Sequence, residues 1–92
     1  MEYRSVTLRD LDAFLEMRME FVQSIRKLAD EAQFRRDTEA YLAAHMEQDD
    51  FSAFVAEENG RLAACCMVSF YQTAPRPRCP SGRYAELLNV YT

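Results

Sequence analysis

Apolar residues recur at intervals of three and four along the first third of the chain. They share one side of a helix that would begin near Leu8, after Thr7 and Asp10, which have the spacing of a capping box. The charged residues of this segment fall mostly on the other side. The spacing therefore predicts an amphipathic helix preceded by a short strand over residues 3–6, with an apolar stripe of Leu11, Phe14, Leu15, Phe21, Val22, Ile25 and Leu28.

A polar stretch over residues 30–37 predicts a turn, after which a second helix would run to about Gln48. Asp37 is the candidate N-cap of this helix, because a side-chain oxygen at that position can accept from a free backbone N–H. Its apolar side would consist of Tyr41, Leu42, His45 and Met46. His45 is the only histidine. A partly buried helix position is favoured over a general base, because no partner for it is visible in the sequence.

Two strands are predicted over residues 51–57 and 62–71, joined by a hairpin at Asn59-Gly60. Both hairpin residues tolerate the positive φ that a type I′ turn requires. Residues 62–70 are apolar at nearly every position, so we expect both faces of this strand to be covered, by helices on both sides of the sheet or by another element.

A proline-rich loop follows over residues 73–82, and a last strand is predicted over residues 84–92. Arg76, Arg78 and Arg83 make the loop basic. A solvated loop explains these arginines, with an anion-binding role as the alternative. The last strand carries Leu87, Leu88, Val90 and Tyr91 and has no turn residue after it.

The order of these elements predicts one α/β (α+β) domain over residues 1–92. It would hold a mixed, mostly antiparallel sheet with flanking helices, in the order β-α-α-β-β-β. The competing interpretation is a compact helical domain, which the hairpin signal between two apolar runs disfavours.

Composition and charge narrow the function classes. The formal net charge is -4, which offers no basic face for nucleic acid. No apolar run is long enough to span a membrane, and the charged start is unlike a signal peptide, so we expect a cytoplasmic protein.

The three cysteines fit that compartment. Their spacing is unlike a zinc site, so no metal is expected. Cys65 and Cys66 should point to opposite faces of their strand as small apolar residues. Burial of a reduced thiol is favoured over a catalytic pair with His45.

Three stretches of the sequence resemble those of a known protein family. The stretch "FVAEENGRLAACCMVSFYQ", the ending "YAELLNVYT" and the start "YRSVTLRDLDAFLEMR" resemble N-acetyltransferases of the GNAT superfamily. In that family an acidic–Asn–Gly–basic hairpin joins the second and third strands, and a strand similar to "LLNVYT" precedes the acetyl-CoA pyrophosphate loop. The resemblance implies an acyl-CoA N-acyltransferase-like fold and transfer of an acetyl group from acetyl-CoA to an amine.

The resemblance also implies site residues. Glu86 matches a position where some members carry a glutamate base, although a solvent-facing residue at the start of the strand explains it as well. Backbone groups of Val90, Tyr91 and Thr92 would bind the pantetheine arm of acetyl-CoA, and Tyr91 could line the acyl pocket or belong to the core. Arg18 and Glu20 fall on the side of the first helix that faces substrate in the family, and ion pairs on a solvated surface explain them equally well.

One family feature is absent from the sequence. The glycine-rich loop that binds the pyrophosphate at a helix N-terminus does not occur, because Gly60 and Gly82 are single and far apart. We therefore expect an incomplete fold, the N-terminal portion of an acetyltransferase. It would be nearly inactive by itself, although the intact parent would transfer acetyl to a small-molecule, peptide or protein amine.

The expected partner is either the C-terminal half of the same fold or a second copy of the chain. A homodimer would form through residues 85–92 and the apolar side of residues 62–70, because a bare edge strand with apolar side chains favours pairing. Two non-enzymatic alternatives remain: a binding or assembly module that dimerises through its last strand, and a truncated relic that folds only as a dimer.

Overall fold

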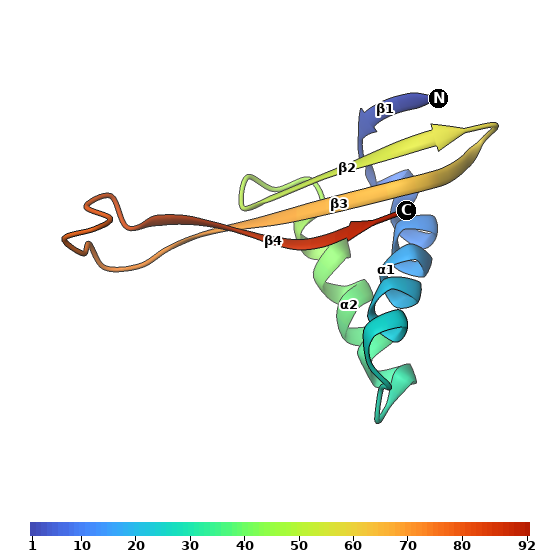
Figure 1. Ribbon diagram of the computed structural model, residues 1–92, viewed down its shortest axis with the longest axis horizontal. Helices are drawn as coiled ribbons and strands as arrows, with labels where there is room; N and C mark the ends of the chain where they lie inside the picture. The colour runs from blue at the N-terminus through green and yellow to red at the C-terminus, as the bar shows by residue number, and fades with distance from the viewer.

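A four-stranded sheet and two long helices make up the structure (Figure 1). The computed structural model describes all 92 residues. In chain order the elements are β1 (Glu2–Ser5), a 3-10 turn (Leu8–Asp10), α1 (Leu11–Ile25), α2 (Glu31–His45), β2 (Phe51–Glu58), β3 (Arg61–Gln72) and β4 (Arg83–Tyr91).

The strands lie in the order β1-β2-β3-β4, and every neighbouring pair is antiparallel. Both helices pack on the same face of this sheet (Figure 1). The β3–β4 hairpin extends well beyond the helices at one end (Figure 1). The predicted α+β class and the order β-α-α-β-β-β are confirmed, and the sheet formed by these strands is antiparallel throughout.

The start of α1 follows the predicted capping box. The Thr7 N–H donates to Asp10 Oδ2 at 2.8 Å, and a 3-10 turn over Leu8–Asp10 leads into the α-helix. The helix ends at Ile25, earlier than the apolar stripe indicated. Leu28 lies beyond the helix but still packs against the core.

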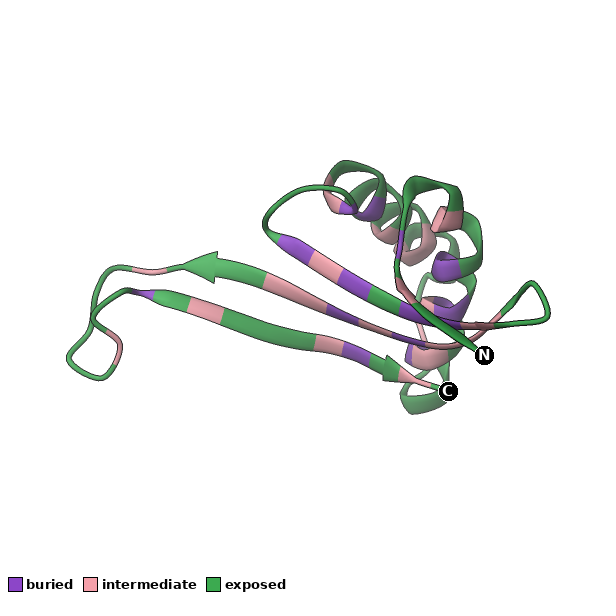
Figure 2. Ribbon diagram, turned by 90° about the horizontal axis from the view of Figure 1, so that it is seen from above, coloured by how far each residue is buried: buried purple, intermediate pink, exposed green.

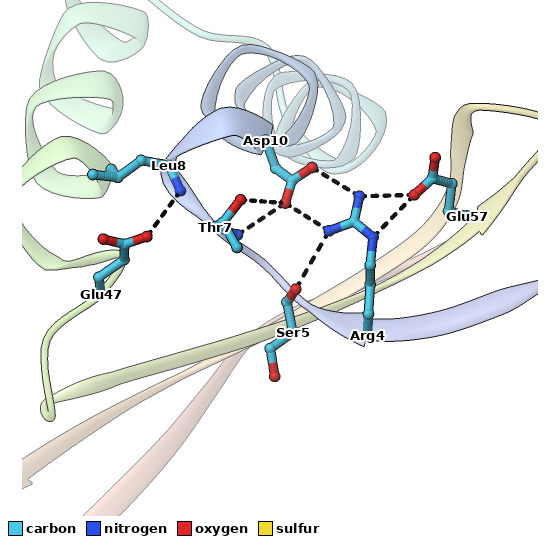
Figure 3. Close-up of polar contacts among 7 residues, drawn as sticks. All are labelled: Arg4, Ser5, Thr7, Leu8, Asp10, Glu47 and Glu57. Atoms are coloured by element: carbon cyan, nitrogen blue, oxygen red, sulfur yellow. Dashed lines mark hydrogen bonds and ion pairs between the residues drawn. The ribbon is translucent and has the colours of Figure 1, made fainter.

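Asp10 also holds β1 to the helix through Arg4 (Figure 3). The Arg4 guanidinium contacts Asp10 Oδ2 at 2.7 Å and Glu57 Oε1 at 2.8 Å. Hydrogen bonding from Arg4, aided by the Thr7 N–H and opposed by partial burial, lowers the pKa of Asp10 to about 2. The cluster therefore joins β1, β2 and the beginning of α1.

We expect Asp10→Ala to lower the free energy of unfolding by about 2 kcal/mol at neutral pH. The pKa of Asp10 is lower in the folded state than in the unfolded chain, so this stabilisation is complete above about pH 5. It is lost as the pH falls through about 2. Urea unfolding of wild type and variant between about pH 7 and pH 2.5 measures the difference, which should shrink on acidification. Asp12→Ala, at an exposed position in the same turn, is the control. A pH-independent loss at Asp10 would contradict the expectation.

The predicted N-cap of the second helix is wrong. The helix begins at Glu31, and the Oδ1 atom of its N-cap, Asp30, accepts from the Gln33 N–H at 3.0 Å. The segment expected to form a turn is the first part of α2, because its polar residues are compatible with an exposed helical surface. Asp37 lies inside the helix, where it accepts from the Gln33 side chain four residues earlier at 2.8 Å.

The predicted hairpin between β2 and β3 is confirmed. Asn59 and Gly60 have φ values of 55° and 77°, the positive region that both central residues of a type I′ turn adopt. The turn places β2 and β3 in register along their whole length apart from one irregularity near Ala56.

The hydrophobic core lies between the helices and the sheet. Cys65 and Met67 point into it, whereas Cys66 and Val68 face the other side, as the alternation of a strand requires. Of the two covers expected for the sheet, helices on both sides are wrong, because both helices cover one face (Figure 2), and cover of the other face by another element stays a prediction. On the opposite side, cross-strand neighbours form what we call the outer apolar face: Phe54, Cys66, Val68, Phe70, Leu87 and Val90. No helix in the structure is both long enough and apolar enough to cross a membrane.

Candidate functional site

The edge strand β4 contains a β-bulge. Asn89 pairs with Met67 and Leu87 pairs with Val68, which leaves Leu88 as an extra residue without a partner on β3. Such a bulge changes which way successive side chains point. Leu88 packs against the core and Asn89 is 1% exposed, so two consecutive residues face inward. The other edge of β4 has no neighbouring strand.

A buried polar cluster holds the bulge against α1 and β3. Arg18 Nη1 donates to the Leu88 carbonyl oxygen and to Asn89 Oδ1, both at 3.0 Å. Asn89 Nδ2 in turn contacts Cys65 Sγ at 3.1 Å. Each polar group of Asn89 thus has a partner, as a fully buried amide requires.

The bulge and Asn89 were not predicted from the sequence. A signal existed, because Leu87 and Leu88 are both apolar and the polar Asn89 follows, which breaks the alternation of a regular strand. The interpretation of Arg18 and Glu20 as solvated ion pairs is wrong for Arg18, which is half-buried and contacts no carboxylate. Glu20 accepts from the Tyr91 hydroxyl at 3.5 Å.

The thiol of Cys65 is a structural group. Burial raises its pKa to about 11, although the hydrogen bond from Asn89 acts in the opposite direction. The thiol is therefore protonated at neutral pH and is a poor nucleophile. His45 contacts Asp50 Oδ2 at 2.9 Å and stacks on Tyr41, and none of the three thiols is hydrogen-bonded to it. The structure contains no catalytic Cys–His pair.

Glu86 lies in a groove of about 340 Å³ between the helices and β4. Arg18 of α1, Thr38 and Tyr41 of α2 and Leu88 of β4 are among its other lining residues. Glu86 is exposed, and its side chain makes no hydrogen bond or ion pair with the protein. Its carboxylate is consequently available to a ligand in the groove.

The other predicted site residues line a second cavity, on the outer side of the sheet. Val90, Tyr91 and Thr92 border a largely apolar hollow of about 460 Å³ together with residues of β1, β2 and β3. The ring of Tyr91 packs edge-on against Phe21 of α1, with centroids 5.7 Å apart. The structure thus places Val90–Thr92 at one cavity and Glu86 in a different one, on the other side of the bulge.

The residues of this chain suit the pantetheine end of acetyl-CoA and do not suit its phosphates. The open edge of β4 offers backbone N–H and C=O groups to an extended amide chain such as pantetheine. The helix N-termini do not suit a pyrophosphate, because Asp10 and Asp12 lie at the start of α1 and Asp30 and Glu31 at the start of α2. No three side chains of His, Cys, Asp or Glu lie together as a metal site.

The basic loop is removed from both cavities. It forms the tip of the projecting β3–β4 hairpin (Figure 1), where Arg76 lies over the ring of Tyr84 at 5.1 Å from the centroid. Arg76, Arg78 and Arg83 line neither of the two cavities.

Comparisons with known proteins give matches among solved structures. No family model matches, and no curated protein matches. A predicted acetyltransferase with acetyl-CoA from Clostridium acetobutylicum superposes with a TM-score of 0.87 at 17% identity, over 99% of this chain and 58% of that chain. A GCN5-related N-acetyltransferase from Ralstonia eutropha gives a TM-score of 0.82 at 22% identity, over 98% of this chain and 60% of that chain.

A putative acetyltransferase from Agrobacterium tumefaciens gives a TM-score of 0.64 at 26% identity, over 100% of this chain and 58% of that chain. The chain thus spans less than two thirds of the length of each of these three structures. Its 92 residues have a fold that forms part of the GNAT N-acetyltransferase fold.

Proposed function

We propose that this chain is the N-terminal portion of an N-acetyltransferase, which transfers an acetyl group from acetyl-CoA to an amine. The observation that carries the proposal is the bulged strand β4, which has a free edge, borders one cavity with its last residues and places Glu86 in another. The acetyltransferase fold of the solved structures supports it. The three free cysteines are compatible with the cytoplasmic location that we also propose.

In the proposed acetyl transfer, Glu86 and the backbone of Val90–Thr92 have separate roles. The amine nitrogen attacks the thioester carbonyl carbon, the C–N bond forms, the C–S bond breaks, and the sulfur leaves as the CoA thiolate, which takes up the second proton that the nitrogen loses on becoming an amide. Glu86 accepts a proton from the acceptor ammonium so that the nitrogen lone pair becomes available. Backbone groups of Val90, Tyr91 and Thr92 hold the pantetheine arm along the free edge of β4, so the carbonyl meets the amine at this edge rather than inside the cavity that Val90–Thr92 border.

We expect these 92 residues to bind the whole cofactor weakly. Acidic side chains lie at both helix N-termini, and the sequence lacks a glycine-rich loop, so neither feature that usually binds a pyrophosphate is provided here. Acetyl transfer by the 92 residues alone should accordingly be slow, and efficient transfer would need a further segment that binds the phosphates.

Two measurements on the 92-residue chain test the proposal. Titration with acetyl-pantetheine, which lacks the nucleotide, should shift the backbone amide NMR signals of Val90, Tyr91 and Thr92. Thiol release from acetyl-CoA with a panel of amines should be slow but measurable, and Glu86→Gln should lower its rate by about 10²-fold because the base is lost.

Glu58→Gln is the matched control, because Glu58 is an exposed glutamate at the opposite end of the sheet, beside the Asn59-Gly60 turn. Turnover that is unchanged in Glu86→Gln would remove Glu86 from the mechanism. Amide shifts confined to other strands would remove β4 from cofactor binding, and rapid turnover by wild type would contradict the need for a phosphate-binding segment.

The outer apolar face favours a second candidate function, a non-enzymatic assembly module. Leu87 and Val90 are 61% and 59% exposed, and they continue an apolar surface that reaches Phe54 on β2. Contiguous exposed apolar surface of this kind usually contacts another protein. We propose that a second copy, or the C-terminal half of the fold, covers this face.

A further inference from the structure

Arg18 has hydrogen-bonding capacity that the protein does not use. Both of its protein hydrogen bonds come from Nη1, to the Leu88 carbonyl oxygen and to Asn89 Oδ1. Nε and Nη2 donate to no protein atom, and neither is sealed from solvent, because no buried side-chain nitrogen in the structure is left without a partner. These free donors belong to a side chain that lines the groove beside Glu86.

The charge of Arg18 also lacks a counter-ion. The ion pairs of the structure join Arg4 to Asp10 and Glu57, Arg35 to Glu16 and His45 to Asp50, and none involves Arg18. Arg18 is half-buried, and both of its acceptors are neutral. A guanidinium remains charged under all ordinary conditions, so a partly desolvated one without a carboxylate is suited to bind an anion.

The rest of the groove indicates what else the ligand carries. Asp37 and Glu86 line it with Arg18, so one cation faces two carboxylates. Neither carboxylate has a cationic partner in the protein. A ligand with one carboxylate and two amines would match these three charges. The volume of about 340 Å³ suits a small molecule rather than a folded partner.

We propose that the groove binds a free amino acid with a basic side chain, whose carboxylate pairs with the unused donors of Arg18. The identification of the amine near Glu86 as the acetyl acceptor rests on the proposed function, whereas the carboxylate subsite at Arg18 does not. Phe34 and Leu88, which line the groove and are only partly buried, provide apolar surface for the methylene groups between the charged ends.

Binding of lysine and of cadaverine, which is lysine without its carboxylate, tests the subsite. We expect the wild-type chain to bind lysine about tenfold more tightly than cadaverine, as measured by calorimetry or NMR titration. Norleucine, which keeps the carboxylate and lacks the side-chain amine, should bind more weakly than lysine. Equal affinities for lysine and cadaverine would overturn the proposal.

The contact between Arg18 and the ligand carboxylate can also be measured directly in the wild-type chain. The Nε–H resonance of Arg18 should shift when lysine is added and should stay in place when cadaverine is added. An Nε–H signal that does not respond to lysine would refute the carboxylate contact even if lysine binds elsewhere.

Variants of Arg18 provide a third test of the carboxylate subsite. Arg18→Gln should abolish the preference for lysine over cadaverine, and Arg18→Lys should restore part of it because the positive charge returns. Amide NMR spectra of each variant verify that β4 keeps its fold. If a variant unfolds, the Nε–H experiment on the wild-type chain decides whether Arg18 contacts the carboxylate. A preference that survives in folded Arg18→Gln would refute the proposal.

The outcomes separate this inference from the proposed function. Lysine that binds through Arg18, with no thiol release from acetyl-CoA for lysine or for any other amine of the panel, supports the subsite and contradicts the transferase role. Acetylation of lysine and cadaverine at equal rates and affinities supports the transferase role and overturns the subsite.

Discussion

Replacing Phe14 with alanine is expected to lower the free energy of unfolding by about 3–5 kcal/mol. Phe14 is 0% exposed and lies on the side of α1 that faces the sheet, within the one cluster of buried side chains. Truncation removes its apolar contacts and leaves a cavity that the helix and the sheet cannot fully close. A domain of this size is stable by only about 5–15 kcal/mol, so the loss is a large part of the total. Urea unfolding followed by circular dichroism measures it.

Phe70→Ala is the matched control, because Phe70 is 44% exposed and lies on the outer apolar face. At low protein concentration, where self-association is minimal, this variant should lose less than about 1 kcal/mol. Equal losses at Phe14 and Phe70 would mean that the core does not lie between the helices and the sheet.

We propose that the chain self-associates through the outer apolar face, and replacing Leu87 and Val90 with lysine is then expected to leave it monomeric. Burying these two side chains against a second copy would contribute roughly 1.5–3 kcal/mol each before ordering costs, and lysine at either position opposes that burial. Leu88 is unsuitable for this test, because the bulge turns it toward the helices and a lysine there would disturb the core. Light scattering at several protein concentrations measures the molecular mass of both proteins.

Ile25→Lys provides the comparison, since Ile25 is 64% exposed at the end of α1 and lies away from the outer apolar face. This variant should keep the association of wild type. A wild-type chain that stays monomeric at all concentrations, with β4 amides protected from hydrogen exchange, would end the proposal of a homodimer.

Local patterns in the sequence were sufficient for most of the elements. The capping box at Thr7 and Asp10 marked the beginning of the first helical segment, because its hydrogen bonds join residues three positions apart. Asn59 and Gly60 identified the hairpin, because the positive φ of its turn depends on those two residues. Helix start signals were less reliable where several acidic residues compete, and Asp37 was chosen where Asp30 is the N-cap.

The candidate site depended on contacts between distant parts of the chain. Arg18 and Asn89 are 71 positions apart, and the hydrogen bond that joins them exists only because α1 packs across β4 at the bulge. The same bulge separates the groove of Glu86 from the cavity of Val90–Thr92, which the sequence had suggested as one site. The strand's alternation in the sequence could not show which face each residue would take, because an extra residue reverses the alternation beyond it.

The sequence by itself therefore determined the order of helices and strands, the β2–β3 hairpin and the apolar residues available for a core. Each of these follows from interactions between residues close in the chain. Only the tertiary structure decided that both helices cover the same face, that Leu88 and Asn89 both point inward, and that Arg18 keeps two nitrogens free in the groove of Glu86. Those features arise from packing between α1, α2 and β4, whose free energy depends on distances that local sequence does not encode.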